Sequence, residues 1–375
     1  MSTKINVRSP YYIKRSYTSV PTLNYATLSL YIYEGDLGTD KPASAQYTLT
    51  KTELNDGDYV VFEISELVRD YLVTEYGSYS TDVVWVEADI TAYAANGSSL
   101  GTVSYDYLAF DGYGYFEDGI NPELSRQLLQ SNTILYYNEG QDIVFPIFAE
   151  DLSTITLTSG AGANVNWEAV DDFWNLYDVS WGYALTPIVI TDDGNTDQKI
   201  QYIRLTNSEE LQDDDSITIT SGVGGATTVI TLEEICEPKF TPLNVIFYNK
   251  FGALQNMWFF KKSITTLNTT SENYKSNILD FSSTPTYSTT SPQVQKFNVN
   301  GKEVITLNSG FYDEAYNEVV RQLMLSENVW IDNGTDVLPV NVNTSSYTFQ
   351  TRVNDKLIQH ALDFEYAFDK INSVR

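Results

Sequence analysis

His360 is the only histidine of the chain, and any Ser-His-Asp or Cys-His nucleophilic pair would have to use it. It falls between Ile358 and Leu362 in the last stretch of alternating apolar and polar residues, on the apolar face. A histidine in that position is typical of a packed, hydrogen-bonded core residue. We therefore predict a structural role for His360 and expect no enzyme activity built on it.

A second candidate site lies in an acidic stretch where a tryptophan recurs every seven residues, at Trp167, Trp174 and Trp181. The carboxylates between them are Glu168, Asp171, Asp172 and Asp178. Aromatic rings beside carboxylates can bind sugars, and two carboxylates at the right separation can hydrolyse a glycosidic bond. With Val170 and Tyr177, the tryptophans also fit one face of a helix, which favours core packing. Core packing is the first interpretation, and ligand or interface contact through the three tryptophans is the alternative.

No cofactor or metal site is predicted from the remaining motifs. Asp193, Asn195 and Asp197 have the D-x-N-x-D spacing that suits calcium, but Gln198 and Arg204 stand where an EF-hand loop needs Gly and Glu. A solvated turn is the simpler interpretation. One cysteine, Cys236, and one histidine argue against a zinc site, and one cysteine excludes an intramolecular disulfide. The chain has neither a phosphate loop nor a dinucleotide fingerprint.

The net charge of −28 is concentrated in the middle of the chain. Residues 1–116 carry 7 basic and 15 acidic side chains, residues 117–238 carry 3 and 22, and residues 239–375 carry 12 and 13. Phosphate binding requires Lys and Arg, so this balance argues against nucleic-acid binding. No apolar run reaches membrane-spanning length, and residues 1–15 lack the apolar core of a signal peptide. We expect a protein made in a cytoplasm and not secreted by a signal peptide, with no membrane contact.

The elements that would position these residues are mostly strands, because the 28 Tyr, 17 Phe and frequent Thr and Val favour pleated sheets. In the C-terminal third, the spacing predicts a short strand over 304–307, a break at 308–310 and an amphipathic helix over 312–325. A hairpin joining 347–353 to 357–368 is predicted after that, and a Ser/Thr/Pro-rich loop over 280–292 before it. In the N-terminal third, Ser65 is predicted to cap a short helix that runs to Leu72.

These patterns predict a mostly β (α+β) fold with two related antiparallel β-sandwich-like domains, each carrying a short amphipathic helix. Residues 1–116 form the first domain and 236–375 the second. Residues 117–149 are predicted to be connecting strands. Residues 150–235 are predicted to be an acidic β-rich insertion, in which the similar stretches 155–160 and 217–222 each precede a glycine-rich turn.

The last third resembles virion structural proteins of tailed bacteriophages. The resemblance rests on residues 239–242, 245–253, 258–262, 323–331, 354–357 and 363–368. Residues 9–13 and 62–68 fit the same group more loosely, and residues 150–235 depart from it. The resemblance implies a tail or baseplate component, a hub or fibre adaptor, with no active site and with a ring arrangement around the tail axis.

The residue pattern agrees with this interpretation, because Tyr and Trp supply rigid contact area at protein interfaces. We therefore predict a non-enzymatic structural component of the phage virion tail. It would form a homo-oligomer and contact other tail, baseplate or fibre proteins. The alternative is a receptor-binding or carbohydrate-binding virion protein that uses the Trp167, Trp174 and Trp181 region. A glycosidase built on Glu168, Asp171 or Asp172 is a third hypothesis.

Overall fold

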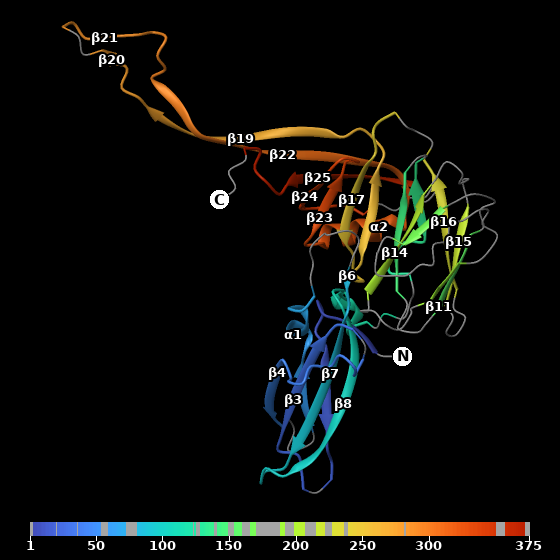
Figure 1. Ribbon diagram of the computed structural model, residues 1–375. Coiled ribbons are helices and arrows are strands. Elements are labelled where there is room, and N and C mark those ends of the chain that lie inside the picture. The colour runs from blue at the N-terminus through green and yellow to red at the C-terminus, as the bar shows by residue number, and fades with distance from the viewer. Residues whose placement is uncertain are drawn as a thin grey trace. The chain divides into compact units, whose positions relative to one another are not determined.

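The computed structural model confirms a mostly β, sandwich-like protein with two α-helices among its described residues (Figure 1). The structure describes residues 3–19, 21–35, 37–53, 59–72, 81–122, 124, 128–138, 141–148, 154–159, 166–169, 188–191, 199–206, 215–221, 227–235, 239–280, 283–349 and 357–371. The chain divides into two compact units. The first contains residues 1–238, 246–257 and 321–326, and the second contains residues 239–245, 258–320 and 327–375.

The N-terminal part of the first unit is a sheet covered by a ribbon and a helix. The sheet order is β1-β8-β7-β3-β4, with strands Thr3–Asn6, Ser99–Phe110, Val84–Tyr93, Tyr25–Tyr33 and Tyr47–Thr52. The ribbon pairs β2 (Tyr12–Ser16) with β5 (Tyr59–Glu63), and α1 (Ser65–Arg69) follows β5. Alternate residues of β3 and β5 are buried in one core with α1, as for Leu28, Phe62 and Val68. This is the period of two of a sheet with one covered face.

Helix α1 differs from its prediction at both ends. It ends at Arg69 and not at Leu72, and its N-cap is Ile64 without a side-chain cap. The Ser65 hydroxyl donates instead to the Glu63 carboxylate, which also accepts the Ser65 backbone N–H at 2.8 Å. The carboxylate of Glu63 therefore binds the donors at the start of the helix, where negative charge is favourable.

The middle of the first unit contains two sheets that share one core. One has the order β10-β14-β12 (Ile143–Ile147, Lys199–Thr206 and Asn166–Ala169), and β6 (Thr81–Asp82) also pairs with β14. The other has the order β13-β11-β15-β16-β9 (Ile188–Thr191, Thr154–Ser159, Ser216–Ser221, Thr227–Glu234 and Ile134–Tyr137). The similar stretches at 155 and 217 lie in β11 and β15, which pair with each other in antiparallel register.

Strands from 117–149 are joined to strands from 150–235 in both of these sheets. β9 pairs in parallel with β16, and β10 pairs antiparallel with β14. Their side chains form one core, with Tyr137 and Phe145 packed beside Leu205 and Leu232. The predicted division into connecting strands and an insertion stays a prediction, but the two segments fold together.

The second unit is organised around β22 (Val294–Asp313), a strand of 20 residues. Its sheet neighbours run in the order β23-β24-β25-β22-β19. The other four strands are Val329–Asp332, Val337–Val342, Leu357–Tyr366 and Ile264–Lys275. Two-residue strands β20 (Leu279–Asp280) and β21 (Thr286–Tyr287) pair between β19 and β22, β20 at the start of the predicted loop 280–292 and β21 within it. Strands β17 (Leu243–Tyr248) and β18 (Leu254–Phe259) and helix α2 (Tyr316–Leu325) have residues in both units.

Three predictions for this part of the chain were wrong. The predicted break at 308–310 is a β-bulge inside β22, where Gly310 adopts φ +88° and the strand continues to Asp313. Because β22 occupies residues up to Asp313, the helix begins at Tyr316 and not at 312. Residues 347–349 form no strand, residues 350–353 of the predicted hairpin lie outside the described residues, and the described partners of β25 are β22 and β24.

Two other predictions for this part are confirmed. The apolar face of α2 is buried at Tyr316, Val319, Val320 and Leu323. Alternate residues of β25, Ile358, His360, Leu362 and Phe364, are buried as their spacing predicted.

Candidate interaction surfaces

The tryptophan region is placed only in part. Trp167 and Glu168 lie in β12, whose Cα register sets Trp167 opposite Leu205 and Glu168 opposite Arg204. The prediction that Trp167 lies on the face of a helix is therefore wrong. Trp174, Trp181, Asp171, Asp172 and Asp178 lie outside the described residues, as do Cys236 and the Asp193–Asp197 motif. The alternative of ligand contact through these tryptophans stays a prediction.

His360 is a buried core residue, as its spacing predicted, with no exposed side-chain surface. Its Nδ1 is 2.5 Å from the hydroxyl of Tyr347, and its backbone N–H donates to the Ser309 hydroxyl at 3.0 Å. Burial lowers the pKa of His360 to about 4, because the charged imidazolium would be desolvated. A neutral, enclosed imidazole of this kind is a packing group, and no described carboxylate forms a hydrogen bond with it.

One exposed surface is a two-stranded arm that extends from the sheet of the second unit. We define the arm as residues 264–300, which comprise β19, β20, β21 and the first part of β22 (Figure 1). β25 pairs with β22 only from residue 304 onward, so beyond the pair Thr266–Val304 the arm has no third strand beside it among the described residues. All 12 residues of β19 are exposed. The arm is thus a ribbon with neither face covered by described residues.

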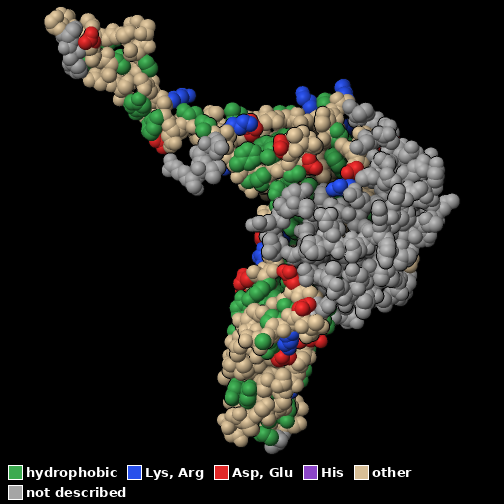
Figure 2. Space-filling model, viewed as in Figure 1, with side chains coloured by type: hydrophobic (Ala, Val, Ile, Leu, Met, Phe, Trp, Pro, Cys, Tyr) green, Lys and Arg blue, Asp and Glu red, His purple; other side chains and the backbone are tan. Residues whose placement is uncertain are grey.

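The arm carries apolar side chains that would be buried in an ordinary strand. Of the large hydrophobic residues exposed in the described part of the chain, eight belong to the arm: Ile264, Leu267, Tyr274, Leu279, Tyr287, Val294, Phe297 and Val299. Figure 2 shows hydrophobic side chains along it. Exposed apolar side chains in a row mark an interaction surface, whereas single ones need no explanation.

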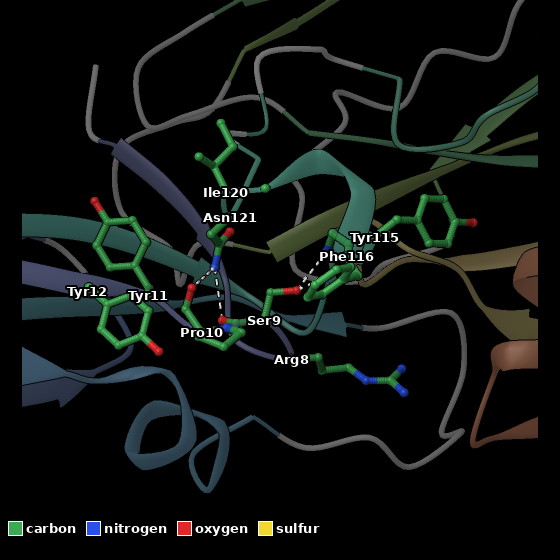
Figure 3. Close-up of a pocket in the computed structure, with 11 residues that line it drawn as sticks. Arg8, Ser9, Pro10, Tyr11, Tyr12, Tyr115, Phe116, Ile120 and Asn121 are labelled. Atoms are coloured by element: carbon green, nitrogen blue, oxygen red, sulfur yellow. Dashed lines mark hydrogen bonds between the residues drawn. The ribbon is translucent and has the colours of Figure 1, made fainter.

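The second exposed surface is a hollow of about 620 Å³ in the first unit. It is lined by residues 8–12 from the chain around the start of β2 and by residues 114–116 and 119–121 from the segment after β8 (Figure 3). Phe116 is fully exposed, and Ile120 and Tyr12 are exposed by 74% and 63%. Phe116 begins the 3-10 turn η1 (Phe116–Asp118), in which the Asp118 carboxylate accepts the Tyr115 N–H at 2.8 Å.

Asn121 holds the two sides of this hollow together. Its amide nitrogen donates to the backbone oxygens of Asn6 and Ser9 at 2.7 and 3.0 Å, and its oxygen accepts the Asn6 N–H at 3.2 Å. The Ser9 hydroxyl accepts the Gly114 N–H at 2.8 Å. These bonds use amide, hydroxyl and backbone groups around the hollow, and apart from Arg8 its exposed rim is apolar and aromatic, with Tyr12, Phe116 and Ile120. Such a rim suits contact with protein better than chemistry on a polar substrate.

A polar cluster also lies on the N-terminal sheet, between β3 and β7. Lys41 Nζ bridges the carboxylates of Glu87 and Asp89 at 2.8 and 3.2 Å, and the Tyr33 hydroxyl donates to Glu87. Burial and the neighbouring Glu87 raise the pKa of Asp106. The lysine pairs with both carboxylates, and this arrangement stabilises the sheet surface.

The described residues contain no group of three or more His, Cys, Asp or Glu side chains that could hold a metal ion. Within the same residues, every helix is too short or too polar to cross a membrane. Neither the arm nor the hollow was predicted as a site. The signal for the arm was the run of residues 264–275, where Ile, Leu and Tyr stand among Thr, Ser and Asn in a strand-like stretch next to a Ser/Thr/Pro-rich segment.

Comparisons with known proteins assign no family. No family model matches the chain, and no curated protein matches it. Among solved structures, a tandem of titin immunoglobulin domains aligns at a TM-score of 0.20 and 8% identity, over 62% of this chain and 94% of that one. An endo-fucoidan hydrolase of glycoside hydrolase family 107 aligns at a TM-score of 0.18 and 9% identity, over 79% of this chain and 36% of that one. Likenesses this weak carry no argument about function.

Proposed function

We propose that the protein is a non-enzymatic structural component of a tailed-phage virion, a tail or baseplate hub or adaptor that assembles into a ring through protein–protein contacts. The observation that supports the proposal best is the arm, whose apolar side chains are exposed along two paired strands. An isolated two-stranded ribbon is only marginally stable in water. Contact with another protein would bury the apolar side chains of the ribbon and so stabilise it.

The sequence resemblance supplies the virion context of this proposal. The protein–protein character follows from the arm and from the aromatic rim of the hollow at Tyr12 and Phe116. His360, the candidate base of a nucleophilic pair, is enclosed and held neutral in the core. The carbohydrate-binding and glycosidase hypotheses rest on residues that lie largely outside the described part of the chain, and no observation favours them.

The test combines sizing of the purified full chain with microscopy. Light scattering after size exclusion should give a mass that is a multiple of the 42.3 kDa chain, and negative-stain images should show closed rings. Mass spectrometry of purified particles from the same phage should find the chain at a copy number that matches the ring. A monomer at tens of micromolar that is absent from particles would reject the proposal.

A further inference from the structure

The arm has two different faces in its outer half. In an antiparallel pair, directly opposite residues point to the same side. Tyr274 lies opposite Gln295 and Glu272 opposite Phe297, so these four share a face, and the Tyr274 and Phe297 rings meet edge to face at 5.7 Å between centroids. We call this the aromatic face.

The opposite side of the same half is a lysine face. Asn273 lies opposite Lys296, and Lys275 lies opposite Val294. The two lysines are therefore diagonal neighbours, and both are exposed. Neither lysine forms an ion pair with a described residue, and two like charges this close favour an anionic partner surface.

Charge complementarity points to the partner. Residues 264–300 contain two lysines, one Glu and one Asp, so the arm has no net charge, and Lys261, Lys262 and Lys302 lie at its base. The whole chain has a net charge of −28, and residues 117–238 alone carry 22 acidic against 3 basic side chains. Because each copy has a net charge of −28, two copies repel each other on average. The arm carries no net charge and is therefore not repelled, and its lysine face is attracted to the carboxylates of the other copy.

The area of the arm is sufficient for association of copies. A strand of 12 residues is about 40 Å long and a two-stranded ribbon is about 10 Å wide, which gives about 400 Å² for each face. Covering both faces, or exchanging one arm each way between two copies, removes about 800 Å² per copy from water. A stable, specific interface needs about this area per partner.

We infer that the arm binds the acidic segment 117–238 of a second copy of this chain, which covers both faces of the ribbon, with Lys275 and Lys296 facing its carboxylates and with Tyr274 and Phe297 buried. This inference rests on the proposed function, because the arm supports that function and the inference names the partner that the arm binds. The arm is the contact that joins neighbouring copies, and its ionic part weakens as salt screens the lysines.

The experiment compares the full chain with two arm variants by light scattering and by sedimentation at low and high salt. Phe297→Asp adds a charge to the aromatic face, and the double variant Lys275→Glu/Lys296→Glu reverses the lysine face. Both sites are exposed, so the folded chain keeps its circular dichroism and melting temperature. The matched control is Lys14→Glu/Lys51→Glu, the same charge change on exposed residues of β2 and β4.

The inference predicts that both arm variants weaken self-association about tenfold or more, while the control associates nearly as wild type does. The lysine-face variant should also lose the salt dependence of the wild type. Arm variants that associate like wild type would overturn the inference and leave the proposed function standing. A wild-type monomer that enters particles through an intact arm would show that the arm binds a different virion protein, which also overturns the inference. A wild-type monomer absent from particles would reject the proposed function itself.

Discussion

The N-terminal sheet and the arm are built from similar residues but meet opposite environments. β7 and β19 are both strands of ten to twelve residues with β-branched and aromatic side chains. Most of β7 is buried under the β2–β5 ribbon, α1 and its neighbouring strands, whereas every residue of β19 is exposed. In the sheet, apolar side chains stabilise the fold of one chain. In the arm the same residue types contribute nothing to a core within the described chain, so any stabilisation they give must come from another molecule.

The largest expected effect concerns the N-terminal sheet, whose apolar side chains are buried. Phe62→Ala removes a fully buried ring from the first core and should lower the free energy of unfolding by about 3–5 kcal/mol. Urea unfolding followed by tryptophan fluorescence measures this. A loss below about 1 kcal/mol would mean that the ribbon does not pack on the sheet.

The next effect concerns His360, which is buried in β25 opposite the bulge of β22. The pKa of His360 is about 4 in the folded chain and about 6.5 in the unfolded chain, so between these values the unfolded chain binds the proton more tightly. His360 therefore gives its full stabilisation above pH 6.5. The contribution falls by an amount on the order of 3 kcal/mol as the pH drops to 4.

The measurement for His360 is the free energy of unfolding from pH 7 to pH 4, in wild type and in His360→Phe. Carboxylates titrate in both proteins, so the difference between the two slopes isolates the histidine. Parallel curves would contradict the buried, neutral state of this side chain.

A smaller effect is expected at the hollow. Asn121→Ala removes the bonds that join Asn121 to the backbone of Asn6 and Ser9, and it should cost about 1–3 kcal/mol. Amide hydrogen exchange should increase at Asn6 and in the neighbouring segment. Phe116→Ala, which changes only the exposed rim, is the control and should leave the exchange unchanged.

The smallest effect is expected in the arm, whose apolar side chains are exposed. Phe297→Ala should change the free energy of unfolding of the isolated chain by less than about 0.5 kcal/mol, because an exposed ring loses little when it is truncated. Chemical denaturation at a protein concentration below the association range measures it. A loss comparable with that of Phe62→Ala would mean that the arm is covered within its own chain.

The sequence allowed prediction of those elements whose buried and exposed residues alternate within the chain. The faces of β25 and α2 follow from spacing alone, because each has one covered side. The course of β22 could not be predicted in this way. Asn308, Ser309 and Gly310 are typical of a break, but the bulge accommodates them, and the buried Ser309 hydroxyl accepts the His360 N–H.

The two candidate interaction surfaces were missed for a related reason. Residues 280–292 have the composition of a loop, yet the described residues among them continue a long ribbon whose pairing joins residues up to 42 positions apart. The hollow joins residues near 10 to residues near 120 through Asn121, and no local pattern indicates such a contact. The resemblance to phage virion proteins predicted a role in assembly without indicating which residues would make the contact.

The continuity of β22 has a mechanical consequence. The same strand that forms one side of the arm continues into the sheet, where residues 304–313 are paired with β25. A pull directed along the arm would load these cross-strand hydrogen bonds together, in shear, and would not open them one after another from an end. A ribbon anchored in this way resists tension best along its own axis and gives way most easily to a force that peels it sideways.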